Sequence, residues 1–106
     1  MTEYIVKRPL RLALAHPGEL MREILTEQLR IPIARAARLM RTSRPSLYAV
    51  LNGTGSVTAD MALRFARLVG GRPELLFHMQ EARDLWYAER RLAKVLAKIE
   101  PVEQAA

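Results

Sequence analysis

A run of arginines in a segment without acids is the feature of this sequence that most directly suggests chemistry. Positions 28–59 hold no aspartate or glutamate. The same stretch carries five arginines, which are Arg30, Arg35, Arg38, Arg41 and Arg44. Guanidinium groups bind phosphate and donate paired hydrogen bonds to guanine. The segment therefore indicates a nucleic-acid partner, with a solvated arginine-rich face as the alternative.

Residues that build catalytic or metal sites are scarce. The chain has two histidines, His16 and His78, and no cysteine. The histidines fall in different predicted helices, and neither has an acidic residue at Asp/Glu-x-x-His spacing. The glycines at positions 53, 55, 70 and 71 follow helices and form no phosphate-binding loop. We therefore expect no catalytic residue, no metal site, no cofactor and no enzymatic activity.

Length and composition fit one small domain. The chain has 106 residues, a net charge of +6 and 50% hydrophobic residues. No uncharged apolar run approaches the ~18 residues of a membrane span, and residues 1–8 do not resemble a signal peptide. The absence of cysteine fits a reducing compartment. These features predict a cytoplasmic protein without a membrane partner.

Composition and punctuation predict an all-α fold. Alanine, leucine, arginine and glutamate are frequent, and only 6% of residues are aromatic. Proline, glycine and capping residues divide the chain into five helices, near residues 16–30, 33–40, 43–51, 58–69 and 73–100. We expect one domain over residues 16–100 with an extended last helix. Residues 1–15 form a predicted N-terminal arm, and residues 101–106 a tail.

The second and third predicted helices have the spacing of a helix-turn-helix. Residues 33–52 match the length of this unit, whose second helix enters the major groove of DNA. Ala37 lies where the two helices cross, and Leu47 and Val50 point into the core. Arg41 occupies a turn position where glycine is usual, so a left-handed backbone there would be strained. We interpret Arg41 as tolerable strain or as a basic residue gained near a phosphate.

The predicted DNA-binding residues lie on this unit. Arg44 could read guanine or clamp a phosphate, and Ser43 with the free helix amides could hold a phosphate oxygen. Tyr48 could contact a thymine methyl or a sugar, or pack against the domain. Asn52 is first a helix terminator and second a phosphate ligand. The full predicted set is Arg35, Arg38, Thr42, Ser43, Arg44, Ser46, Tyr48 and Asn52.

Four blocks of the sequence, in order and with matching gaps, resemble one family. They are HPGE at 16–19, TSRPSLYAVLNG at 42–53, VTADMALR at 57–64, and PE at 73–74 with MQ at 79–80 and DLW at 84–86. The pattern, which covers residues 16–91, resembles HigA-type antitoxins. These are the VapI-like branch of the Xre and lambda-repressor helix-turn-helix superfamily. Arg41 and the pair Gly71-Arg72 depart from the family pattern.

The resemblance implies a fold, partners and a function. The fold would be a lambda-repressor-like helix-turn-helix domain, and the function that of a bacterial antitoxin. Such a protein binds a HigB toxin, a RelE-like messenger-RNA endonuclease, and represses its own operon as a dimer on double-stranded operator DNA. A stand-alone Xre-type repressor without a toxin is the alternative.

Two surfaces beyond the helix-turn-helix could bind protein partners. Surplus apolar residues on the last helix are our candidate dimer interface, namely Trp86, Leu92, Leu96 and Ile99. An N-terminal arm with Tyr4, Ile5 and Val6 is the competing interface. A cationic toxin could use the acids Glu81, Asp84, Glu89, Glu100 and Glu103, which otherwise pair with arginines along a solvated helix.

Overall fold

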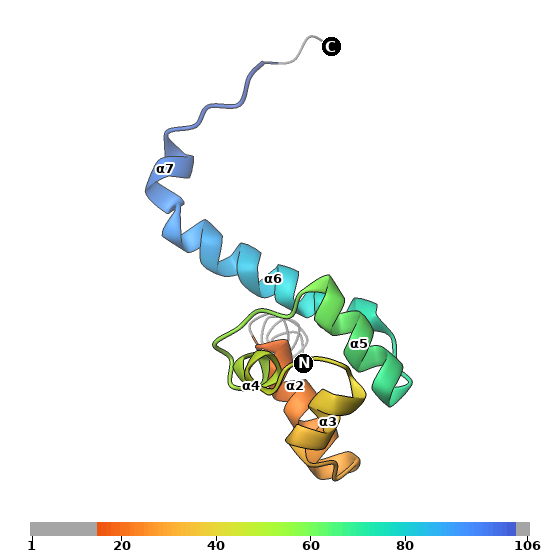
Figure 1. The fold of residues 1–106 in the computed structure, drawn as a ribbon. Helices are drawn as coiled ribbons and strands as arrows, with labels where there is room; N and C mark the ends of the chain where they lie inside the picture. The colour runs from red at the N-terminus through yellow and green to blue at the C-terminus, as the bar shows by residue number, and fades with distance from the viewer. Residues whose placement is uncertain (1–14, 104–106) are drawn as a thin grey trace, which may run out of the picture.

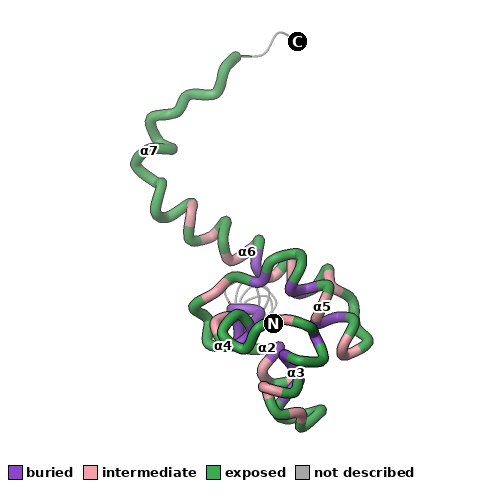
Figure 2. The backbone as a smooth tube through the Cα atoms, in the orientation of Figure 1, coloured by how far each residue is buried: buried purple, intermediate pink, exposed green. Residues whose placement is uncertain are grey.

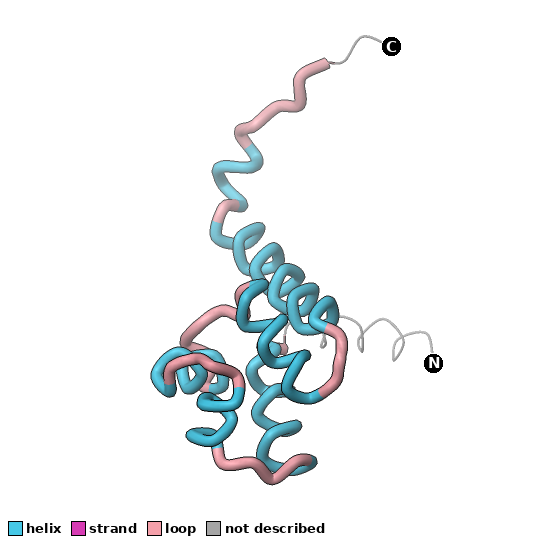
Figure 3. Tube along the Cα trace, turned by 45° about the vertical axis from the view of Figure 1, so that its right-hand side comes forward, coloured by secondary structure: helices cyan, strands magenta, loops and turns pink. Residues whose placement is uncertain are grey.

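The described part of the chain, residues 15–103 of a computed structural model, consists of helices and loops (Figures 1 and 3). The elements are α2 (Pro17–Glu23), its π-helical continuation η1 (Ile24–Gln28), α3 (Ile33–Leu39), α4 (Arg44–Leu51), α5 (Ala59–Val69), α6 (Pro73–Arg91) and α7 (Ala93–Ala97). No strand occurs among these residues, so the all-α prediction is confirmed. No helix of this part is long and apolar enough to cross a membrane.

The predicted helix boundaries follow from side-chain caps. The Ser43 hydroxyl accepts a hydrogen bond from the Ser46 amide at 3.2 Å, and Thr58 accepts one from the Met61 amide at 3.1 Å. These bonds satisfy amides that the first turn of a helix leaves without an intrahelical partner. Gly70 ends α5 in the left-handed conformation, with φ of 78°. The starts of α4 and α5 and the end of α5 are confirmed.

The core lies where α2, η1, α3, α4, α5 and the first half of α6 meet (Figure 2). Leu47 and Val50 of α4 are buried, as predicted, and Ala37 of α3 is 1% exposed at the predicted helix crossing. The largest fully buried side chains include Phe65, Met21 and Leu25. Burying such side chains supplies about 1.5–3 kcal/mol each and is the main stabilising contribution in a chain without disulfides.

A close backbone approach fixes α2 against α4. A Cβ atom built on Gly18 would lie 1.9 Å from the carbonyl oxygen of Val50, so only glycine fits there. His16, just before α2, is 7% exposed. Its Nδ1 accepts from the Gly18 amide at 2.9 Å, and its Nε2 lies 2.9 Å from the carbonyl oxygen of Gly55. His16 therefore ties the start of α2 to the loop that follows α4.

The last predicted helix is divided in the structure. We expected one helix over residues 73–100, but α6 ends at Arg91 and a separate short helix begins at Ala93. Leu92 between them has φ of −97° and ψ of 7°, outside the helical region. Residues 91–103 are all exposed, so no packing against the core supports a continuous helix. Figure 1 shows the second half of α6 and α7 projecting as an arm from the globular part.

Two arginines hold left-handed backbone conformations in the turns on either side of α3. Arg30 has φ of 53° and Arg41 has φ of 56°. This conformation costs a residue other than glycine roughly 1–2 kcal/mol. The expected departure at Arg41 is thus confirmed as backbone strain, while its expected phosphate contact stays a prediction. The strain at Arg30 was not predicted.

Candidate nucleic-acid interface

Helix α4 presents most of the predicted DNA-binding residues to solvent. Ser43, Arg44, Ser46 and Asn52 are all exposed, and Tyr48 is 40% exposed. The opposite face of α4 is held in the core by its buried leucines and valine. Tyr48 is therefore accessible to a DNA groove.

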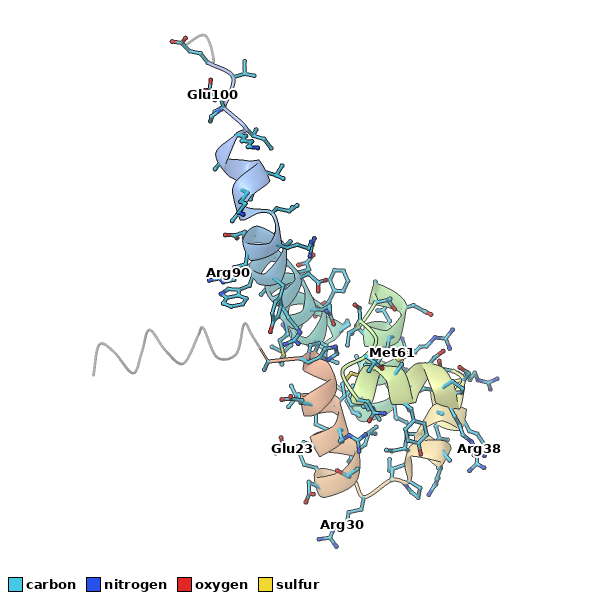
Figure 4. The ribbon with its side chains drawn as sticks, turned by 90° about the vertical axis from the view of Figure 1, so that its left-hand side faces the viewer. Glu23, Arg30, Arg38, Met61, Arg90 and Glu100 are labelled. Atoms are coloured by element: carbon cyan, nitrogen blue, oxygen red, sulfur yellow. The ribbon has the colours of Figure 1, made fainter. Side chains whose placement is uncertain are left out.

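The remaining predicted residues flank α4. Arg35 and Arg38 lie exposed on α3, while Thr42 in the turn is half-buried. Figure 4 shows Arg38 and Arg30 pointing away from the globular part. No acidic residue lies between positions 27 and 60 of the sequence, so α3, α4 and the turn between them contain only positively charged ionic side chains.

The start of α4 is closed by two serine hydroxyls. Besides accepting from the Ser46 amide, the Ser43 hydroxyl donates to the Ser46 hydroxyl at 2.7 Å. This bond orients both hydroxyls, and Pro45 removes one amide that would otherwise need a partner. The positive end of the helix dipole and the Arg44 side chain meet at this point. A phosphate or a base edge could be bound here.

Asn52 has a partner that the sequence did not reveal. Its Oδ1 accepts from the Arg22 guanidinium of α2 at 2.5 Å. The side-chain Nδ2 of Asn52 can still donate to a phosphate. Arg22 adds a cation at the end of α4. The sequence signal was weak because Arg22 and Asn52 lie 30 positions apart.

Gln80 of α6 is hydrogen-bonded to the loop between α4 and α5. It is 5% exposed, its Oε1 accepts from the Val57 amide at 2.8 Å, and its Nε2 donates to Asp84 at 2.9 Å. Both ends of a buried amide are thus satisfied, which makes it specific in orientation. Gln80 and His16 together fix the loop that leads away from the DNA-facing helix.

The predicted partner-binding acids lie on or near the projecting arm, away from the basic face. The five predicted partner-binding acids are exposed on α6 and beyond it. In Figure 4 Arg90 and Glu100 mark this arm, away from Arg38 and Arg30 on the globular part. Within residues 15–103, no three histidine, aspartate or glutamate side chains gather as metal ligands.

Sequence relatives of this chain are bacterial regulators. It is 30% identical over 90 residues to the "Uncharacterized HTH-type transcriptional regulator YbaQ" of Escherichia coli strain K12, covering 83% of this chain and 80% of the relative. It is 32% identical over 75 residues to "Virulence-associated protein I" of Dichelobacter nodosus, covering 71% and 69%. No protein-family model matches the sequence.

Solved structures similar to this chain include antitoxins. An addiction module antidote protein of a HigA family from Coxiella burnetii shares 31% identity with a TM-score of 0.74, over 84% of this chain and 98% of that one. The antitoxin GraA in complex with its operator shares 30% identity with a TM-score of 0.75, over 85% and 92%. The Pseudomonas aeruginosa antitoxin HigA with the higBA promoter shares 26% identity with a TM-score of 0.76, over 85% and 99%.

Proposed function

Because this chain belongs to the HigA-type family of helix-turn-helix antitoxins, we propose that it represses its own operon and neutralises a HigB-like toxin. The observation that carries the proposal is the capped, acid-free helix α4 with Arg44 at its exposed start. The protein would act in the bacterial cytoplasm, without catalysis of its own. A stand-alone Xre-type repressor is the second candidate, because both share the same DNA-binding surface.

The proposed DNA interface centres on α4 in the major groove. Arg44 and Ser46 would reach base edges or phosphates, with Tyr48 against a sugar or a thymine methyl. The α3 arginines and the polar residues at the ends of α4 would bind the DNA phosphates on either side of the major groove. These flanking residues are Arg35, Arg38, Thr42, Ser43 and Asn52. Positioning contacts of this kind set the register, while base contacts select the sequence.

The proposed active form is a homodimer on a palindromic operator. One recognition helix covers few base pairs, and a two-fold axis doubles the site with half-sites about 34–36 Å apart or a multiple of that. The proposed interface is the apolar face of the arm, where Leu92 is 38%, Leu96 45% and Ile99 62% exposed. Trp86, half-buried on α6, lies at its inner end under the Arg90 guanidinium, 3.3 Å from the ring centroid. The competing interface at Tyr4, Ile5 and Val6 lies outside the described residues.

Light scattering tests the dimer and its interface together. At tens of micromolar we expect the dimer mass for the full chain and a monomer mass for the triple variant Leu92→Ser, Leu96→Ser, Ile99→Ser. The variant removes apolar area that has no partner within residues 15–103. Leu63→Ser is the matched control, since Leu63 is 59% exposed on α5. A dimer that survives the triple variant would move the interface elsewhere, and a monomeric wild type would remove the dimer proposal.

Co-expression tests the toxin partner and separates the two candidate functions. The small reading frame beside the gene should arrest growth when expressed alone, and this chain should relieve the arrest. Arg44→Ala should rescue equally well, because the exposed acids that would receive a cationic toxin lie on α6 and beyond it, away from α4. If the neighbour is harmless, or if rescue fails, the stand-alone repressor is the better description.

A further inference from the structure

The turn between α3 and α4 is short and strained. Arg41 carries it in the left-handed region, and two backbone bonds close it. The amide of Arg41 donates to Arg38 at 3.0 Å, and that of Thr42 donates to Ala37 at 3.0 Å. Since side chains other than glycine disfavour this backbone, the turn needs support from elsewhere to stay populated.

Arg64 of α5 supplies that support. Its Nη1 donates to the carbonyl oxygens of Met40 at 2.9 Å and of Arg41 at 2.7 Å. Its Nε donates to Asp60 at 3.1 Å, one helical turn earlier. A guanidinium is rigid and planar, so the Nε bond to Asp60 fixes the direction from which Nη1 meets both carbonyls and holds the peptide between them.

The ion pair by itself explains little of this arrangement. The Arg64 side chain is 37% exposed and that of Asp60 is 75% exposed, and exposed pairs contribute little to stability. Asp60 acts as an orienting acceptor that aims the fork at the turn. The hydrogen bonds from Arg64 to the Met40 and Arg41 carbonyls connect α5 to the turn of the helix-turn-helix.

We propose that Arg64 is a positioning residue for DNA binding, which holds the left-handed turn at Arg41 and so sets the orientation of α4. This inference rests on the proposed DNA-binding function. Without Arg64 the turn would relax to an ordinary backbone conformation in part of the molecules. Operator affinity would then fall in proportion to the fraction of molecules that still hold the binding geometry.

A double-substitution cycle with Arg41→Gly tests this inference. Arg64→Ala should weaken operator binding by about 5- to 30-fold, the population shift that the left-handed cost allows. In the Arg41→Gly background, where the same backbone is unstrained, Arg64→Ala should cost less than about threefold. Arg64→Lys keeps the cation but loses the fork, so its effect should fall between those of the wild type and alanine.

The salt dependence of binding distinguishes positioning from direct contact. Since the Arg64 guanidinium binds protein carbonyls, Arg64→Ala should leave the slope of log K against log salt unchanged. Loss of a phosphate contact would reduce that slope by about 0.9. Arg67→Ala, which removes the same charge from the same helix, is the matched control and should not couple to Arg41→Gly. An equal loss in both backgrounds, or a reduced slope for Arg64→Ala, would overturn the proposal.

Amide hydrogen exchange supplies a readout that needs no DNA. In Arg64→Ala the amides at positions 41 and 42 should exchange faster than in the wild type, and adding Arg41→Gly should restore their protection. If these amides are unaffected, Arg64 does not hold the turn. If exchange behaves as expected while the wild type does not prefer its own operator, the turn inference stands and the proposed function fails.

Discussion

Gly18→Ala should strongly destabilise this protein. The added methyl group would lie 1.9 Å from the Val50 carbonyl oxygen, which is backbone and cannot rotate away. Relief requires α2 to move off α4, which would also break the bond between His16 and the Gly55 carbonyl. We expect the free energy of unfolding to fall by more than about 3 kcal/mol, out of roughly 5–15 kcal/mol for a chain of this size. Thermal unfolding followed by circular dichroism would measure it, with a melting temperature lower by more than roughly 12 °C.

Gly71→Ala is the matched control for this experiment. A Cβ on Gly71 would meet Val69 at an ordinary 3.6 Å, and Gly71 is exposed. Its stability should change by less than about 0.5 kcal/mol. A Gly18→Ala protein as stable as this control would show that α2 and α4 do not approach each other as described.

Arg44→Ala should weaken operator binding by about 5- to 150-fold, equivalent to about 1–3 kcal/mol, and relax the preference at one base pair per half-site. The expectation follows from an exposed guanidinium at the first residue of α4, where a recognition helix meets base edges. Titration of the gene's own upstream DNA, compared with random DNA of equal length, would measure both effects. Binding to random DNA should fall much less.

Arg38→Ala and Arg91→Ala serve as controls for lost charge. Arg38 on α3 is expected to contact a DNA phosphate. Its loss should therefore weaken binding to all sequences alike and lower the slope of log K against log salt by about 0.9. Arg91 ends α6 on the arm, so its loss should leave operator affinity within about twofold. Equal losses on operator and random DNA for Arg44→Ala would identify Arg44 as a phosphate clamp rather than a base reader.

Local signals predicted most of the fold. Helix boundaries followed from residues such as Ser43, Thr58 and Gly70, because each satisfies its own helix end through neighbours a few positions away. The buried stripe of α4 followed from its spacing for the same reason. The break at Leu92 could not be predicted, because no proline or glycine marks it and the deciding factor is the absence of packing on the arm.

The DNA-facing side chains were predictable, but their supports were not. Exposure of Arg44 was predictable because a charged residue at the first position of a helix, directly after the Ser43 cap, is rarely buried. In contrast, the contacts of Arg22 with Asn52, of Gln80 with Val57 and of Arg64 with Met40 join residues 23 to 30 positions apart. Such pairs depend on how whole helices pack, which hydrophobic periodicity alone does not specify.

The two strained turns lie at the two ends of one helix, α3, and this affects which helix of the globular part unfolds locally most easily. Arg30 precedes α3 and Arg41 follows it, so melting α3 alone would release both left-handed residues at once. Melting of α4 or α5 would not release backbone strain at both ends in this way, because their ends are closed by side-chain caps or by glycine. On this ground we expect the amides of α3 to exchange faster than those of α4, and DNA contacts from Arg35 and Arg38 to slow that exchange.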